Sequence, residues 1–121
     1  MARHNELGKE GETLAKQFLE DKGYQIVAMN WRYRRAEVDI IAKWEDWLIF
    51  VEVKTRTSEA FGRPEDFFTP AKERLMSQAA FAYIEQMDFM GEVRFDVIAI
   101  LAPPNSNPQI THFEDAFFPG L

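Results

Sequence analysis

Three acidic side chains and one lysine stand at strand spacing within a short stretch of the chain, namely Glu37, Asp39, Glu52 and Lys54. Carboxylates can hold a hard divalent cation such as Mg²⁺ together with water and phosphate oxygens. A lysine beside such an ion can stabilise the charge of a phosphoryl group or help to position an attacking water. These residue types indicate phosphoryl chemistry, provided that the fold brings them together.

The segments 36–43 and 44–54 both have the period-two pattern of strands, and Glu45-Asp46 is the only polar break between them. We expect an antiparallel hairpin with a two-residue loop, in which Asp39 faces Glu52 and Glu37 faces Lys54. Opposed side chains have Cβ atoms about 4.5–5.5 Å apart. The pattern places Val38, Ile40 and Ala42 together on the opposite face. Glu-Asp is not a favoured two-residue turn, and a slip of one residue would separate the acids.

Two facing carboxylates among Val, Ile, Phe and Leu destabilise a strand pair, because like charges repel and lose hydration. A divalent cation would reverse both penalties. The surroundings of Asp39 and Glu52 are too apolar for an ordinary solvent face, so the pattern favours a metal site. The alternative is a half-exposed hairpin with a solvated charged face.

Length and composition predict one domain over residues 1–121, since 46% of the residues are hydrophobic and 28% are charged. Cysteine is absent, which excludes disulfides, thiolate ligands and Cys nucleophiles. The N-terminal residues lack an apolar core, so we expect no signal peptide, no membrane segment and a cytoplasmic location.

The net charge of −6 argues against ordinary duplex binding by a monomer. Residues 32–74 are nevertheless neutral, because nine acidic residues balance nine basic ones. This distribution is compatible with a basic rim around an acidic pocket. The basic residues of this window are Arg32, Arg34, Arg35, Lys43, Lys54, Arg56, Arg63, Lys72 and Arg74.

The remaining elements place further candidates near the acidic hairpin. Glu12 lies at the edge of the apolar stripe of a predicted first helix, and Arg56 continues the alternation of Lys54. Arg34 and Arg35 form a basic turn that could grip a nucleic-acid backbone. Lys72 points either to the acids or to solvent. The first predicted helix spans residues 5–22 and is ended by Gly23, and the second is capped by Thr69 with Pro70 at its first position. The other predicted strands are 24–33, 92–101 and 109–113.

For four further residues the pattern favours a structural role or offers no chemical one. Phe61, in the irregular stretch 55–68, is expected to pack on the core, with base stacking as the alternative. Arg94 and Asp96 are expected to form a structural pair. Nothing beside His112 suggests a metal ligand or a base, so a histidine-based mechanism is not expected.

The order of elements, with Asp39 followed thirteen residues later by Glu52-Val53-Lys54, resembles the PD-(D/E)XK nuclease superfamily. Almost the whole chain is similar to the YraN-like family of small, uncharacterised bacterial proteins. One departure is Ala36, where that family usually has glycine. The matching pieces are GKEGE at 8–12, Gly23-Tyr24, Asn30, EVDII at 37–41, FVEVKTR at 50–56, Phe61-Gly62, Lys72, Ala79 and RFDV at 94–97.

The resemblance implies an α/β restriction-endonuclease-like domain, with a central mixed sheet flanked by helices in the order αβββαβ and a short last strand. It implies Asp39 and Glu52 as ligands of Mg²⁺ or Mn²⁺ and Lys54 as the catalytic lysine. Similarity to archaeal Holliday junction resolvases adds Glu12 to the ligands. Residues expected to contact the substrate or support the ligands are Glu37, Arg56, Lys72, Arg34 and Arg35.

The function predicted on this basis is metal-dependent endonucleolytic hydrolysis of branched DNA in repair or recombination. Junction resolution requires two cuts related by a dyad, which predicts a symmetric homodimer. A basic DNA-repair or DNA-uptake protein is a further expected partner. One alternative is a non-catalytic nucleic-acid-binding or protein-interaction module that retains the nuclease fold. Another is a structural domain whose acids bind calcium or nothing.

Overall fold

The computed structural model describes residues 2–117, without the side chains of residues 2–5 and 67. A five-stranded sheet has the strand order β1-β2-β3-β4-β5. The first three strands form an antiparallel meander, β3 and β4 are parallel, and β5 is antiparallel to β4. The elements are α1 (Ala2–Asp21), β1 (Gln25–Tyr33), β2 (Ala36–Trp44), β3 (Trp47–Arg56), the 3-10 helix η1 (Pro64–Phe67), α2 (Pro70–Met87), β4 (Glu92–Leu101) and β5 (Gln109–Phe113).

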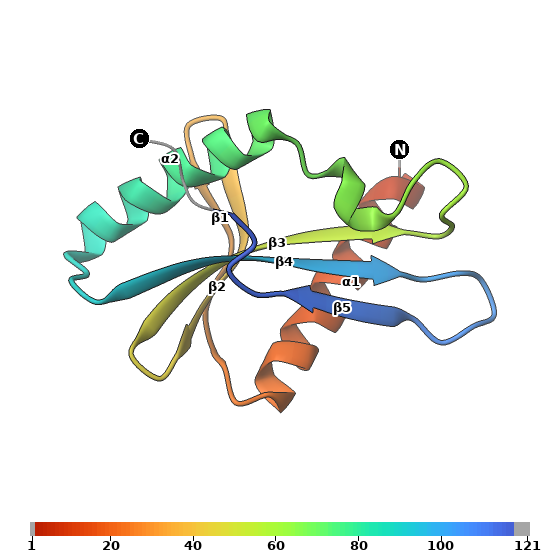
Figure 1. Cartoon of the computed structure of the whole chain (residues 1–121), viewed down its shortest axis with the longest axis horizontal. Helices are drawn as coiled ribbons and strands as arrows, with labels where there is room; N and C mark the ends of the chain where they lie inside the picture. Colours follow the sequence, from red (N-terminus) through yellow and green to blue (C-terminus); the bar gives the residue numbers. More distant parts are fainter. Residues whose placement is uncertain (1, 118–121) are drawn as a thin grey trace.

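The two helices cover opposite faces of the sheet (Figure 1). Ala15 and Leu19 of α1 belong to one buried cluster, and Met76 and Tyr83 of α2 belong to the other. The central strand β3 contributes to both clusters, as expected for a strand that is covered on both faces. This mixed α/β architecture confirms the predicted fold class and is compatible with a restriction-endonuclease-like fold.

The predicted helix boundaries are confirmed by their capping contacts. Gly23 has a φ of 95°, and its N–H donates to the Glu20 carbonyl at 2.9 Å, which ends the helix as glycine commonly does. Thr69 Oγ1 accepts the Lys72 N–H at 3.3 Å, so Lys72 lies in the first turn of α2. The bounds of α1 differ from the predicted 5–22, because this helix runs from Ala2 to Asp21.

The predicted hairpin register is confirmed from Trp44↔Trp47 to Ile40↔Val51. The two-residue turn is possible despite its unfavourable sequence because Glu45 adopts the left-handed conformation, with a φ of 54°. The regular ladder ends at Ile40↔Val51. Asp39 and Glu52 therefore lie just beyond the last regular pair.

The side-chain alternation of β2 changes at Asp39. Val38 and Ile41 pack in the cluster under α2, whereas Ile40 and Ala42 pack in the cluster under α1. The prediction that Val38 shares a face with Ile40 and Ala42 is therefore wrong. The local reason is the end of the ladder: the Val53 N–H donates to Asp39 Oδ2 at 2.8 Å, so a side chain serves as the acceptor in place of a backbone carbonyl.

Candidate metal centre

The carboxyl groups of Asp39 and Glu52 lie together where β2 and β3 leave the regular ladder. Asp39 is only 8% exposed. Its burial, and next the negative charge of Glu52, raise the pKa of Asp39 to about 9, and a hydrogen bond between the two carboxyl groups acts in the same direction. At neutral pH the pair therefore holds a proton that a cation could replace.

Lys54 forms an ion pair with Glu52 of this pair. Its Nζ lies 3.0 Å from Glu52 Oε2, and both side chains are 12% exposed. The two residues are two positions apart on the central strand, so their side chains leave the same face. The strand thus presents a carboxylate and an ammonium group side by side.

Lys72 approaches the same group from α2. The contact of its ammonium group with Lys54 lowers the pKa of Lys72, and partial burial lowers it further. Of the two orientations that the sequence left open, Lys72 adopts the one toward the acidic hairpin. The Thr69 cap sets this geometry, because α2 starts directly after it, at Pro70, which places Lys72 in the first turn.

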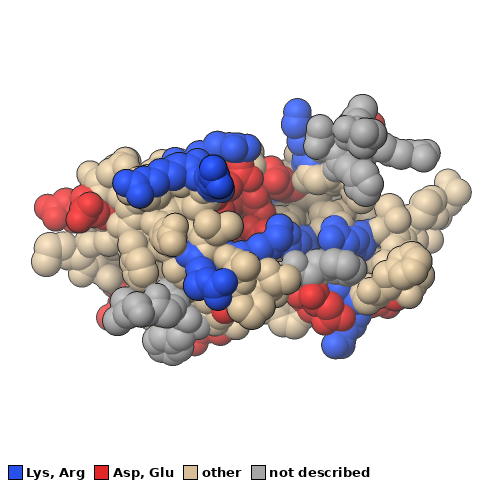
Figure 2. Space-filling view, turned by 90° about the horizontal axis from the view of Figure 1, so that it is seen from above, with Lys and Arg blue, Asp and Glu red and all other residues tan. Residues whose placement is uncertain are grey.

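A hollow of about 170 Å³ opens over the acidic pair. It is bounded by the β1–β2 turn, by β2 and β3, and by α2. On the face seen in Figure 2, Lys and Arg side chains lie on either side of a central acidic group. The residues that line the hollow are Arg35, Ala36, Glu37, Asp39, Glu52, Lys72, Leu75 and Met76.

Glu37 lines this hollow but does not have the predicted partner. Arg32 Nε lies 3.0 Å from Glu37 Oε2, and the two residues face each other across β1 and β2. Lys54 pairs with Glu52 instead. The reason is the end of the β2–β3 ladder, which leaves Glu37 beyond the paired positions and closer to β1.

Glu12 reaches the site from α1. The helix packs so closely on β3 that a side chain at Gly11 would overlap Thr55 Oγ1. Asn30 Nδ2 donates to Glu12 Oε1 at 2.8 Å. Burial raises the pKa of Glu12, and the charges of Glu37 and Glu52 add to this, while the Asn30 hydrogen bond opposes it. Among the side chains that the structure describes, however, no three Asp, Glu or His groups are arranged to hold one ion.

The arginines predicted to lie near the substrate separate into two groups. Arg35 lines the hollow beside Asp39 and Glu52. Arg34, with a φ of 57°, lies 5.1 Å from the ring centroid of Tyr33. Arg56 Nη1 donates to the Thr55 carbonyl at 2.8 Å. Of these three side chains, only Arg35 is therefore among the lining residues of this hollow.

A second polar cluster joins β4 to β5 and confirms the predicted Arg94–Asp96 pair. Arg94 makes two hydrogen bonds of 2.8 Å to the fully buried Asp96. His112 Nε2 lies 2.7 Å from Asp96 Oδ2, a contact that sequence reasoning missed because the partners are 16 residues apart. Burial acts to raise the pKa of Asp96, but the hydrogen bonds from His112 and Arg94 hold it below its ordinary value. Asp96 is thus held ionised by its hydrogen bonds to Arg94 and His112, and we assign this cluster a structural role.

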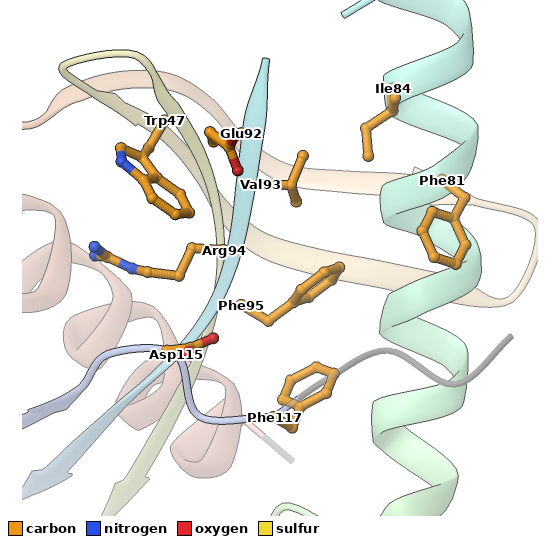
Figure 3. Close-up of a pocket in the computed structure, with 9 residues that line it drawn as sticks. All are labelled: Trp47, Phe81, Ile84, Glu92, Val93, Arg94, Phe95, Asp115 and Phe117. Carbon is orange, nitrogen blue, oxygen red and sulfur yellow. The ribbon is translucent and has the colours of Figure 1, made fainter. Parts of the chain in front are cut away.

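Another cavity, of about 370 Å³, lies between α2 and the start of β4 (Figure 3). Phe81, Ile84, Val93 and Phe95 form much of its wall. Arg94 also borders it, but its guanidinium group is engaged with Asp96. Glu92 and Asp115 also line it, but much of the wall is apolar, which makes this cavity a poorer candidate for chemistry than the acidic hollow.

Phe61 is 94% exposed, so the prediction that it packs on the core is wrong. The loop that carries it folds on itself. The Gly62 N–H donates to the Glu59 carbonyl at 3.1 Å, and the Ala60 N–H donates to Ser58 Oγ at 3.4 Å. Gly62, with a φ of 125°, completes the turn that presents Phe61 outward.

Among the residues that the structure describes, no helix is long and apolar enough to cross a membrane.

The family model for UPF0102, an uncharacterised protein family, matches residues 11–100. A UPF0102 protein of Flavobacterium psychrophilum is 49% identical over 118 residues, covering 98% of each chain. A UPF0102 protein of Rhodococcus opacus is 43% identical, covering 97% of this chain and 100% of its own.

A relative from Geotalea uraniireducens, also called a UPF0102 protein, is 43% identical over 96% of this chain and 92% of its own. The names of these relatives do not state an activity. The matched region nevertheless includes Glu12, Asp39, Glu52, Lys54 and Lys72. The chain belongs to the uncharacterised protein family UPF0102, the YraN-like family.

Proposed function

We propose that the protein is a metal-dependent endonuclease that hydrolyses phosphodiester bonds of structured or branched DNA. The observation that carries this proposal is the buried Asp39–Glu52 pair beside Lys54. A buried pair of carboxyl groups lowers the stability of the fold, and a hard divalent cation bound between them would remove this destabilisation. Costly polar groups in a hollow are typical of functional sites.

The donor set fits Mg²⁺ or Mn²⁺. Asp39 and Glu52 offer carboxylate oxygens, which hard cations prefer, and the hollow leaves room for water or a phosphate oxygen. A bound ion would polarise a phosphoryl oxygen and lower the pKa of a bound water. Glu12 is the further proposed ligand, brought near by the close packing of α1 on β3.

The cationic side chains have separate proposed tasks. Lys54, beside Glu52, stabilises the negative charge of the phosphoryl group and orients the attacking water. Lys72 and Arg35, which both line the hollow, hold the phosphates that flank the scissile bond. Arg34 and Arg56 lie outside the lining of the hollow, and we assign them contacts farther along the backbone of the DNA.

The proposal extends to the assembly. Two cuts across a four-way junction require two sites related by a dyad, so resolution of a junction would use a symmetric homodimer. The chain carries a net charge of −6, which opposes tight binding of DNA by a monomer. A basic DNA-repair or DNA-uptake protein that delivers the substrate would offset this repulsion.

A second candidate is a non-catalytic module that binds nucleic acid or protein. Two observations favour it: the net negative charge, and the lack of a third acid at liganding distance among the described residues. A structural domain is a third candidate. Thermal stabilisation by Mg²⁺ that is lost in Asp39→Ala would exclude the structural domain, and cleavage would then separate the first two candidates.

The decisive experiment is cleavage of labelled four-way junction, flap, duplex and single-stranded DNA at low salt with Mg²⁺ or Mn²⁺. Wild type is compared with Glu52→Gln and with Glu85→Gln, a matched control at an exposed position on α2. We expect cleavage by wild type and the control, and none by Glu52→Gln or in EDTA. Absence of cleavage on every substrate, despite metal binding, would support the non-catalytic module.

A further inference from the structure

Asn30 occupies an unusual position in β1. Its φ of 52° is left-handed, although the residue lies within a strand and is not glycine. Such a conformation costs about 1 to 2 kcal/mol, although asparagine tolerates it better than most residues. Strain of this kind persists where the surrounding contacts outweigh it, and it is common at functional sites.

The left-handed residue reverses the side-chain alternation of β1. Met29 packs in the cluster under α1, while Trp31 packs in the cluster under α2. In a regular strand these two residues would share a face. The flanking pairs Met29↔Ile40 and Trp31↔Val38 set Asn30 opposite Asp39. The two strands therefore change face at the same level, which is the level of the proposed ligand Asp39.

The side chain of Asn30 crosses to α1 at this point. Its Nδ2 donates to Glu12 Oε1 at 2.8 Å, which links the first strand to the first helix. An amide donor carries no charge, so it orients a carboxylate without competing with a cation as a lysine would. One oxygen of Glu12 is thereby occupied, and hydrogen bonds of this kind fix the direction of metal-binding groups.

We propose that Asn30 is a positioning residue of the metal centre, and that its amide orients the Glu12 carboxylate toward the Asp39–Glu52 pair. This inference rests on the proposed function, since it requires a cation at that pair. A positioning role explains why a strained asparagine lies opposite Asp39. The hydrogen bond from Asn30 also fixes the orientation of Glu12, which α1 alone does not determine.

The test is the affinity for Mn²⁺, measured by titration calorimetry without substrate. Asn30→Gly keeps the left-handed backbone but removes the amide. Asn105→Gly is the matched control, because Asn105 has a φ of 62° in the β4–β5 loop. We expect Asn30→Gly to weaken Mn²⁺ binding about tenfold, and the control to bind as wild type does.

A double-mutant cycle identifies the route of the effect. Glu12→Gln should weaken binding at least as much as Asn30→Gly, and the double variant should bind no more weakly than Glu12→Gln alone. Asn30→Ser, whose side chain is too short to reach Glu12, replaces Asn30→Gly if the latter does not fold. The folded state of every variant is checked by circular dichroism.

Two outcomes would overturn the role of Asn30 while leaving the proposed function intact. One is binding of Mn²⁺ to wild type and Asn30→Gly with equal affinity. The other is a double variant in which the two losses multiply, since Asn30 would then act independently of Glu12. Failure of wild type itself to bind Mn²⁺ would reject the metal centre, and with it both proposals.

Discussion

Replacement of Asp39 by asparagine is expected to stabilise the metal-free protein and to abolish its metal binding. The amide keeps the geometry of the site: its oxygen can accept the Val53 N–H, and its nitrogen can donate to Glu52. What the substitution removes is a carboxyl group that the fold holds in an unfavourable environment, next to another carboxyl group.

The magnitude follows from the linkage between protonation and folding. The pKa of Asp39 is about 9 in the folded chain, compared with an ordinary value of 3.8. Holding a proton at pH 7 on a group that is normally ionised costs up to about 4 kcal/mol. Sharing of the proton with Glu52 and local relaxation reduce this, so we expect a gain of about 1 to 3 kcal/mol, or roughly 5 to 10 °C in Tm.

The sign of the pH dependence is determined by the raised pKa. Between about pH 4 and about pH 9 the folded chain binds more protons than the unfolded chain, so wild-type stability falls as the pH rises through this window. Asp39→Asn should flatten this decline. Saturating Mn²⁺ should flatten it in wild type, because the cation replaces the proton.

The assay is urea unfolding at several pH values between 5 and 9, in EDTA and in Mn²⁺. Asp46→Asn, the same chemical change in the exposed hairpin turn, is the control and should change the free energy of unfolding by less than about 0.5 kcal/mol. A lower stability of Asp39→Asn than of wild type at pH 8 in EDTA would contradict this expectation. An equal loss of stability in both proteins between pH 5 and pH 9 would contradict it as well.

Three further predictions concern the packing of α1, the role proposed for Lys54 and the exposed Phe61. Gly11→Ala should lower the free energy of unfolding by about 1 to 3 kcal/mol, measured in urea, because the added methyl group overlaps Thr55. In Gly8→Ala, the control, the methyl group meets no atom, so this change should be neutral or stabilising. Equal effects of the two substitutions would contradict the close packing of α1. Lys54→Met should reduce cleavage at least about a hundredfold while Mn²⁺ affinity in calorimetry changes little, and retained cleavage would remove its assigned role. Phe61→Ala should leave Tm unchanged, because the ring is exposed, but weaken binding of DNA with unpaired bases in fluorescence anisotropy; unchanged affinity would exclude base stacking.

The hairpin and the helix ends could be predicted from local chemistry. The polar pair Glu45-Asp46 stands between two apolar segments, and a two-residue turn there sets the register that brings Asp39 and Glu52 together. Thr69 and Pro70 are strong start signals for α2, and they place Lys72 in its first turn. Each of these inferences uses neighbours in the sequence, where spacing determines geometry.

The features that sequence reasoning missed depend on contacts between distant elements. The change of face at Asp39 lies at the level of the left-handed Asn30 on the neighbouring strand, and neither residue reveals this by its own pattern. The contact between His112 and Asp96 requires β5 to pair with β4. The apolar side chain of Phe61 predicts a place in the core, but hydrogen bonds within its loop hold it outside.

The proposed function requires that the buried Asp39–Glu52 pair holds a divalent cation. The most direct test is anomalous diffraction from crystals soaked in Mn²⁺, with crystals of Glu52→Gln treated in the same way. We expect an anomalous peak between the two carboxyl groups in wild type and none at that place in the variant. A wild-type crystal with no peak there, at Mn²⁺ concentrations that support cleavage, would contradict the account.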